Sequence, residues 1–229
     1  MKFSQKLHQA ISDKHLLKHP YYQAWNEGKL TRDDLQTYAQ QYYAQVDLFP
    51  RCVSAIHSQC GDAQGRKMLM ENLIEEEGMT AEEHADHPEL WIRFGEGLGS
   101  TRESMTNASP YPETADLNDK FFSLCRQSYA EGLAALYTYE YQIPKISEVK
   151  IKGLKEFYNI HDDKTLSFFA VHQEADVEHS VVCADLLDRL DEKEQEKALG
   201  AAKTTAHALW DFLSGVQRET LDKRTAQAA

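Results

Sequence analysis

Residues 31–57 read TRDDLQTYAQQYYAQVDLFPRCVSAIH, and this stretch carries the clearest fold signal in the chain. Thr31 offers an N-cap hydroxyl with the acidic Asp34 three residues later, which resembles a capping box. Apolar and aromatic residues then recur at helical spacing, namely Leu35, Tyr38, Tyr42, Val46 and Phe49. The stretch therefore predicts one long amphipathic helix, with a kink at Pro50 because proline removes a backbone donor.

The helical pattern continues over the rest of the chain. Eleven glycines and six prolines punctuate 229 residues, and no segment alternates apolar and polar residues long enough to indicate a sheet. Further helices are expected at about 63–77, 88–98, 115–146 (interrupted near Pro144), 147–158, 163–190 and 193–221, with a loop at 100–114 and a frayed tail at 222–229. We therefore expect a single all-α domain over residues 1–229.

Composition argues against several classes of protein. The net charge of −12 disfavours a nucleic-acid partner, which would demand a basic face. No apolar run reaches the roughly 18–20 residues that span a bilayer, and the N-terminus lacks the apolar segment of a secretory signal. The four cysteines form no CxxC pair, which argues against a disulfide framework. We expect a cytoplasmic protein without a nucleic-acid or membrane partner.

The segment HQEADVEH, residues 172–179, carries the strongest chemical signal. His172, Asp176 and His179 are spaced i, i+4, i+7, so they lie within about 60° of one another around a helix. Two imidazoles and a carboxylate on one face suit a transition metal such as iron, manganese or zinc. The alternative is a solvated polar stripe with two incidental histidines. Three such residues at this spacing favour the metal site.

Two further segments could complete such a site. Glu140 lies in the apolar and aromatic run ALYTYEYQIP, where a buried carboxylate needs a metal cation, a Lys or Arg partner, or strong hydrogen bonds. The triple Glu75–Glu77 ends a predicted helix and precedes His84 and His87. Such a triple is usually a solvated face, but one inward carboxylate and one histidine would add ligands. Helices that donate carboxylates and imidazoles into a bundle interior build di-iron and di-manganese sites.

Eleven tyrosines crowd a few helical segments. Most are expected to be core residues, although a few beside a redox metal could be oxidised or donate protons. Lys150, in SEVKIKG, reads on its own as a surface lysine.

Four blocks together resemble the CADD-like family of the TenA/PqqC, haem-oxygenase-like superfamily: residues 28–43, FPRCVSAIHSQC, ALYTYEYQIP and HQEADVEH. The resemblance runs from about His15 to beyond His179. It implies an all-α, haem-oxygenase-like bundle that forms a homodimer and holds two transition-metal ions, iron or an iron–manganese pair, but no haem. It also implies synthesis of 4-aminobenzoate for folate from O₂ and a reductant, with the ring taken from an internal tyrosine and the amino group from an internal lysine.

The resemblance also implies roles for individual residues. The metal ligands would be Glu76, His87, Glu140, His172, Asp176 and His179, with His87 preferred to His84. The remaining site residues would be Tyr22 as the sacrificed tyrosine, Tyr38 and Tyr139 as further active-site tyrosines, and Lys150 as the amino donor.

Several rival functions predict features that differ from those of this sequence. A TenA-type thiaminase would carry a cysteine shortly before the helix glutamate, and GLAALYTYE at 132–140 contains none. A PqqC-type oxidase is metal-free and binds a polyanion, which the acidic composition and the full ligand set disfavour. Two alternatives stay open: a di-iron oxidase of the same fold acting on an external small molecule, and a protein-interaction or signalling module.

Overall fold

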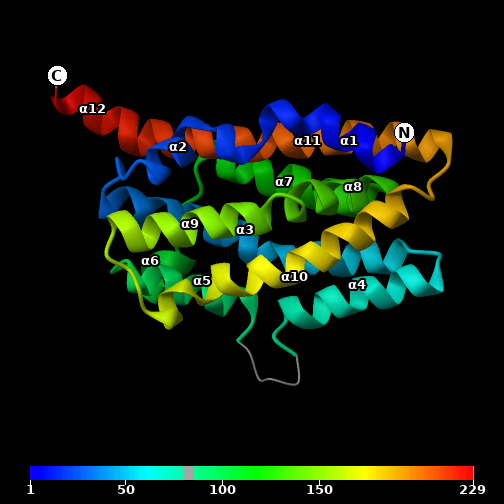
Figure 1. Ribbon diagram of the computed structural model, residues 1–229, viewed down its shortest axis with the longest axis horizontal. Coiled ribbons are helices and arrows are strands. Elements are labelled where there is room, and N and C mark those ends of the chain that lie inside the picture. The colour runs from blue at the N-terminus through cyan, green and yellow to red at the C-terminus, as the bar shows by residue number, and fades with distance from the viewer. Residues whose placement is uncertain (80–84, 229) are drawn as a thin grey trace.

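The computed structural model describes residues 1–79 and 85–228, without the side chains of residues 174–178 and 228. Figure 1 shows a bundle of helices, and no strand occurs in the described residues, so the predicted all-α class is confirmed. The α-helices are α1 (Phe3–Ile11), α2 (Pro20–Asn26), α3 (Arg32–Gln59), α4 (Ala63–Glu76), α5 (His87–Gly97), α6 (Arg102–Thr106), α7 (Pro112–Gln127), α8 (Tyr129–Glu140), α9 (Ile143–Phe157), α10 (Asp163–Leu187), α11 (Glu192–Gln217) and α12 (Lys223–Ala228). Among them, no described helix has an apolar stretch long enough to cross a membrane.

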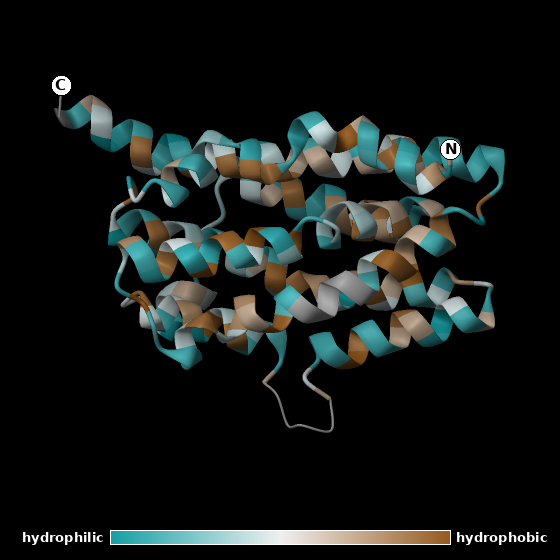
Figure 2. Ribbon diagram, viewed as in Figure 1, coloured by the Kyte–Doolittle hydropathy of each residue, from teal (hydrophilic) through white to brown (hydrophobic). Residues whose placement is uncertain are grey.

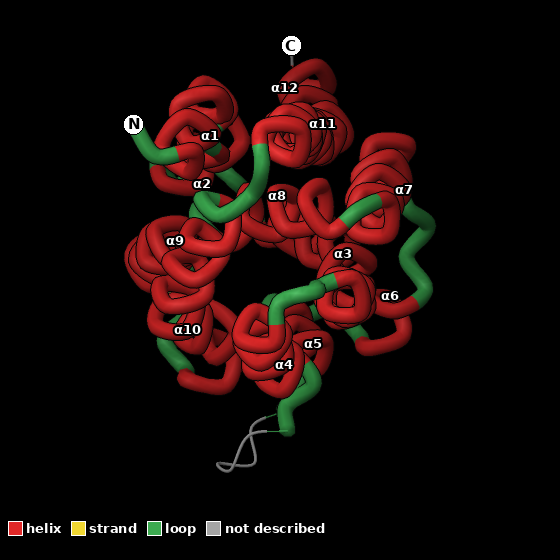
Figure 3. Tube along the Cα trace, turned by 90° about the vertical axis from the view of Figure 1, so that its right-hand side faces the viewer, coloured by secondary structure: helices red, strands yellow, loops and turns green. Residues whose placement is uncertain are grey.

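Helix α8 forms the centre of the bundle. Every residue from Ala130 to Glu140 is buried. It packs against α11, α7, α10 and α3, and the end-on view in Figure 3 shows the other long helices around it. The peripheral helices carry both hydrophilic and apolar stretches in Figure 2, as helices with one buried face do. A carboxylate at the end of α8, such as Glu140, is therefore placed deep inside the molecule.

Helix α3 confirms the long helix predicted at 31–57. The Thr31 hydroxyl accepts from the Asp34 backbone N–H at 3.2 Å, and the Asp34 carboxylate accepts from the Thr31 N–H at 2.7 Å. This reciprocal pair is the capping box expected from the sequence. The helix continues through Pro50 and buries Tyr38 and Tyr42 on its inner face.

The long helix expected at 115–146, interrupted near Pro144, is wrong in its first part, because the chain turns at Ser128; the expected interruption lies close to the gap between α8 and α9. This residue has an extended backbone (φ −158°, ψ 161°) and separates α7 from α8, which then pack against each other. Its hydroxyl caps α8 by accepting from the Glu131 N–H at 3.3 Å and donates to the Glu131 carboxylate at 2.6 Å. The pair Ser128–Glu131 is a capping signature that the apolar periodicity concealed.

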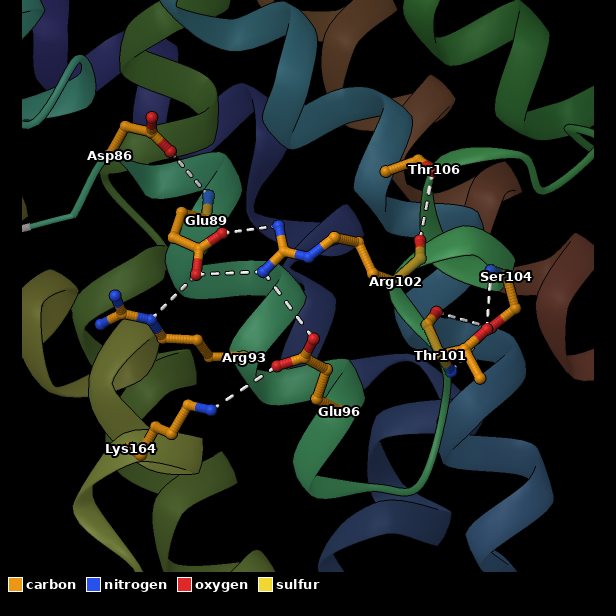
Figure 4. Close-up of polar contacts among 9 residues, drawn as sticks. All are labelled: Asp86, Glu89, Arg93, Glu96, Thr101, Arg102, Ser104, Thr106 and Lys164. Carbon is orange, nitrogen blue, oxygen red and sulfur yellow. Dashed lines mark hydrogen bonds and ion pairs between the residues drawn. The ribbon is translucent and has the colours of Figure 1, made fainter.

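The expected loop at 100–114 is partly helical, since it contains α6 and the start of α7. Figure 4 shows how α6 is tied to α5: Arg102 Nη1 lies 2.8 Å from a carboxylate oxygen of Glu89, which also pairs with Arg93 at 3.2 Å. Lys164 of α10 joins the same network through Glu96, at 3.6 Å. These contacts hold α5 against α6 and α10.

Both ends of the chain are more helical than the sequence predicts. Helices α1 and α2 were not predicted, and the tail expected to be frayed forms α12. Arg224 of α12 forms an ion pair with the Asp34 carboxylate and donates to the Lys29 carbonyl at 3.0 Å. The tail is therefore attached to the start of α3.

Candidate active site

Three helices bring one carboxylate and two imidazoles together in the interior. Glu76 of α4, His87 of α5 and His172 of α10 are all buried, and each offers one ligand atom within 4.8 Å of the others. An oxygen of Glu76 lies 2.8 Å from His87 Nδ1, and the rings of His87 and His172 have centroids 4.4 Å apart. Residues separated by almost a hundred positions in sequence therefore meet at one point.

Local sequence signals place Glu76 and His87 at neighbouring helix ends. Helix α4 stops after Glu76 because Gly78 adopts the left-handed backbone (φ +65°), which favours glycine. Helix α5 starts at His87, where the Asp86 side chain accepts from the Glu89 N–H at 2.7 Å and proline occupies the next position. The first turn of α5 thus fixes one imidazole beside the last turn of α4.

The tautomer of His172 follows from its hydrogen bond. Its Nδ1 lies 2.6 Å from the carbonyl oxygen of Phe168, one turn earlier in α10. A carbonyl oxygen can only accept, so Nδ1 carries a proton, and in the neutral imidazole Nε2 then presents its lone pair. A backbone carbonyl behind the outer nitrogen is a common way to orient a metal-binding histidine.

A second group lies on the continuation of α10. His179 Nε2 is 3.3 Å from a Glu75 oxygen, and its Nδ1 is 4.0 Å from Glu140 Oε1. The described partners of Glu140 also include Asn72 and Cys183. The side chain of Asp176 and the whole of His84 lie outside the described residues. Five of the six ligands implied by the resemblance are thus described, and all five lie in these two groups.

The chemistry of these donors fits a divalent transition metal. Carboxylates and imidazoles suit iron and manganese, and Glu76 and Glu140 are buried here, where uncompensated carboxylate charge is costly. Burial raises the pKa of Glu76, but the neighbouring His87, followed by His172 and His179, outweighs it, so the pKa lies below its usual value. The ionised carboxylate that a metal requires is therefore the favoured form.

A second cluster surrounds Lys150 of α9. Its Nζ donates to the Tyr22 hydroxyl at 2.9 Å and also to the Tyr38 hydroxyl. The two hydroxyl groups lie 2.8 Å apart. The ammonium or amine also lies over the rings of Trp25 and Phe169, at 5.3 and 5.4 Å from their centroids. The resemblance implied roles for Lys150, Tyr22 and Tyr38, and the structure brings these three side chains into direct contact.

Burial changes the protonation of this cluster. Lys150 is only 4% exposed, and burial lowers its pKa well below the usual lysine value. Burial also raises the pKa values of Tyr22 and Tyr38 above the usual tyrosine value. An uncharged amine beside two uncharged phenols is therefore favoured, and the expectation that Lys150 by itself reads as a surface residue is wrong.

Helix α9 can hold Lys150 there because Gly153 lets it approach α2. A Cβ at Gly153 would lie 2.9 Å from a ring carbon of Trp25, closer than ordinary contact. Lys150 shares the inner face of α9 with the buried apolar residues Ile143, Ile146 and Leu154. Because these four residues are spaced i, i+3, i+7 and i+11, the sequence already indicated that Lys150 lies on the buried face of the helix.

Tyr139 lies outside the Lys150 cluster and is linked to it through Tyr42, a residue that carried no assigned role. The Tyr42 hydroxyl donates to the Tyr139 hydroxyl at 2.8 Å, and the Tyr42 ring stacks on Tyr38 at 5.7 Å. Trp91 contacts Tyr42 at 5.1 Å and Phe168 at 4.7 Å between centroids. Phe168 in turn lies against His172 at 4.1 Å, so continuous ring contacts join the tyrosines to the group formed by Glu76, His87 and His172.

Other functional candidates were missed by sequence reasoning. Glu75 was named only as part of a triple, and Asn72 and Cys183 were not considered. Helical spacing could have identified Asn72 and Cys183, because Asn72 precedes Glu76 by four residues and Cys183 follows His179 by four.

Known proteins match nearly the whole chain. Residues 36–210 match a family described as iron-containing redox enzymes. A 4-aminobenzoate synthase from Nitrosomonas europaea is 38% identical over 226 residues, covering 93% of this chain and 90% of that protein. One from Chlamydia muridarum is 36% identical over 214 residues, covering 93% and 89%. These relatives confirm the family resemblance seen in the sequence.

A solved structure also matches the fold. It comes from Shewanella denitrificans and is described as a domain of unknown function with a heme oxygenase-like fold. It aligns with a TM-score of 0.77 at 16% identity and covers 94% of this chain and 92% of that one. At this identity the likeness shows the fold alone, and the haem-oxygenase-like bundle is confirmed.

Proposed function

Because the chain belongs to the family of iron-containing redox enzymes, we propose that it is a 4-aminobenzoate synthase in which Tyr22 supplies the ring and Lys150 the amino group. The observation that carries this proposal is the buried contact of 2.9 Å between Lys150 Nζ and the Tyr22 hydroxyl oxygen. The 4-aminobenzoate synthases at 36–38% identity support the product.

The connectivity of tyrosine agrees with that product. The hydroxyl of Tyr22 marks ring carbon Cζ, which is para to Cβ, and 4-aminobenzoate has its amino group para to its carboxylate carbon. A new bond from the Lys150 nitrogen to Cζ replaces the bond to the hydroxyl oxygen, which leaves as water, and the nitrogen is released from Lys150 Cε as that carbon is oxidised to an aldehyde. Cleavage of the Tyr22 Cα–Cβ bond and oxidation of Cβ to the carboxylate, with O₂ as the electron acceptor and oxygen source, give this arrangement. The ring and Cβ of one tyrosine then supply the whole benzoate carbon skeleton.

The residues of this chain prepare the reaction by position and protonation. Burial favours the uncharged form of Lys150, which has the lone pair needed to form a carbon–nitrogen bond. Tyr38 hydrogen-bonds both Lys150 and the Tyr22 hydroxyl, so it can hold or accept a proton at either atom. Trp25 and Phe169 enclose the amine and keep water from it.

The metal ligands would be Glu76, His87, Glu140, His172, Asp176 and His179. Two transition-metal ions held there, iron or an iron–manganese pair, would supply with O₂ and an external reductant the oxidising power of the reaction.

Complementation of a 4-aminobenzoate auxotroph tests the proposal. The wild-type gene is expected to restore growth, whereas Tyr22→Phe, Lys150→Arg and His172→Ala are expected to fail at equal levels of folded protein. Tyr43→Phe is a matched control, because Tyr43 is only partly buried and its hydroxyl contacts Asp47 rather than Lys150. Rescue by both Tyr22→Phe and Lys150→Arg would point to an external substrate, and failure of the wild type would contradict the activity itself.

A further inference from the structure

Both oxygens of the Glu140 carboxylate are held by neutral donors. Asn72 Nδ2 donates to Oε1 at 2.5 Å, and Cys183 Sγ donates to Oε2 at 3.6 Å. Glu140 is 1% exposed, Asn72 3% and Cys183 2%, so solvent does not compete for these contacts. The orientation of the carboxylate in the bundle therefore depends on two side chains from other helices.

The two donors lie one turn from candidate metal ligands. Asn72 precedes Glu76 by four residues on α4, and Cys183 follows His179 by four residues on α10. Residues at this spacing share a helix face, so each donor faces inward with the ligand beside it. Through Glu140, these contacts connect α8 to both α4 and α10.

Neutral donors suit a carboxylate that must also bind a cation. An amide or a thiol fixes the direction of the oxygens without cancelling their negative charge, whereas a lysine or arginine at either position would compete with the metal. The described partners of Glu140 are an amide, a thiol and an imidazole. None of the three carries a fixed positive charge.

Fold stability alone gives a poor explanation of Asn72. Its Oδ1 is buried and has no hydrogen-bond partner among the described residues. An unsatisfied buried acceptor costs about 1–3 kcal/mol, so a residue selected only for packing would be apolar here. The contact that accounts for an asparagine here is the hydrogen bond from its Nδ2 to Glu140.

We propose that Asn72 and Cys183 are positioning residues that hold Glu140 in the orientation in which it binds metal, an inference that rests on the proposed function. Removal of either donor takes away the contact that holds one carboxylate oxygen, so the carboxylate is less strictly oriented. Hydrogen bonds that orient a metal ligand in this way typically contribute about 10- to 100-fold to metal affinity.

The test compares metal binding by folded, purified variants. Asn72→Leu and Cys183→Ala remove the donors, whereas Cys183→Ser keeps one. Iron(II) and manganese(II) are titrated separately into metal-free protein against a competing chelator, and the metal-loaded proteins are compared by electron paramagnetic resonance. Circular dichroism checks the fold. Asn118→Leu and Cys125→Ser on α7 are matched controls, because neither residue contacts a candidate ligand among the described interactions.

The expected result is a loss of affinity of about 10- to 100-fold for at least one ion in Asn72→Leu and Cys183→Ala, with an altered resonance spectrum. Cys183→Ser is expected to recover most of the affinity, and both controls to match the wild type. Wild-type affinity and spectrum in both donor-less variants would overturn the proposal while leaving the proposed function intact. A wild-type protein that binds neither ion would overturn both.

Discussion

Lys150→Met should remove a pH dependence from the stability of the protein. Burial lowers the pKa of Lys150 in the folded state, whereas an unfolded lysine titrates near about 10.4. Below the folded pKa the amine is charged in both states, so folding bears the full cost of burying the charge. Above about 10.4 it is neutral in both states and the cost is absent.

Between these two pKa values the unfolded chain binds one more proton than the folded chain. The contribution of Lys150 to the free energy of unfolding of the wild type therefore rises with pH by about 1.4 kcal/mol per pH unit. Methionine has no such proton, so the wild-type value should rise relative to Lys150→Met by about 1.4 kcal/mol from pH 8.5 to pH 9.5. Loss of the hydrogen bonds to Tyr22 and Tyr38 adds an offset of about 1 kcal/mol each, and this offset is independent of pH.

The assay is urea unfolding of the metal-free proteins at the two pH values. Tyr22 and Tyr38 stay uncharged in the folded protein over this range because burial raises their pKa values. Lys152→Met is the matched control, since Lys152 lies on the same helix and is exposed. Parallel pH dependences for the wild type and Lys150→Met would refute the reasoning, because the buried amine would then be charged.

Three other outcomes are expected. Ser128→Ala should lower the free energy of unfolding by about 1 kcal/mol in urea, because it removes the cap of α8; an unchanged value would show that the turn needs no cap. Gly153→Leu should lower the free energy of unfolding by about 1–3 kcal/mol, and with it the melting temperature, because the new side chain would overlap Trp25. Gly200→Ala is the control, since open space surrounds Gly200 and the added methyl group should not destabilise the protein. Removal of bound metal by a chelator should lower the melting temperature of the wild type, because free metal at a hundred times its Kd stabilises the folded state by about 2.7 kcal/mol. An equal decrease in His172→Ala would show that the metal binds elsewhere.

Helix identity was predictable where apolar spacing and a cap agreed. The α3 prediction combined the Thr31 capping box with a buried stripe, and the structure has both. The break at Ser128 was missed because apolar residues continue on both sides of it, so periodicity alone cannot detect a change of direction. Its capping pair with Glu131 was the one local signal.

The site was predictable in part from spacing. His172 and His179 share a face of α10, as their spacing indicates, and both lie beside carboxylates from other helices. The choice of Glu76 and His87 came from family resemblance, because no local pattern shows which acid of a triple points inward. Lys150 was misread as exposed because lysine is rarely buried, although its apolar neighbours on α9 indicated the inner face.

The origin of the product atoms is the central claim, and isotopic labelling measures it most directly. The protein is produced with ring-¹³C tyrosine or with ¹⁵N-ε-lysine, loaded with iron and manganese, and exposed to O₂ and a reductant. Mass spectrometry of the 4-aminobenzoate is expected to find the tyrosine label in the ring and the lysine label in the amino group, with matching losses at Tyr22 and Lys150 in the protein. Unlabelled 4-aminobenzoate from either protein would contradict the account.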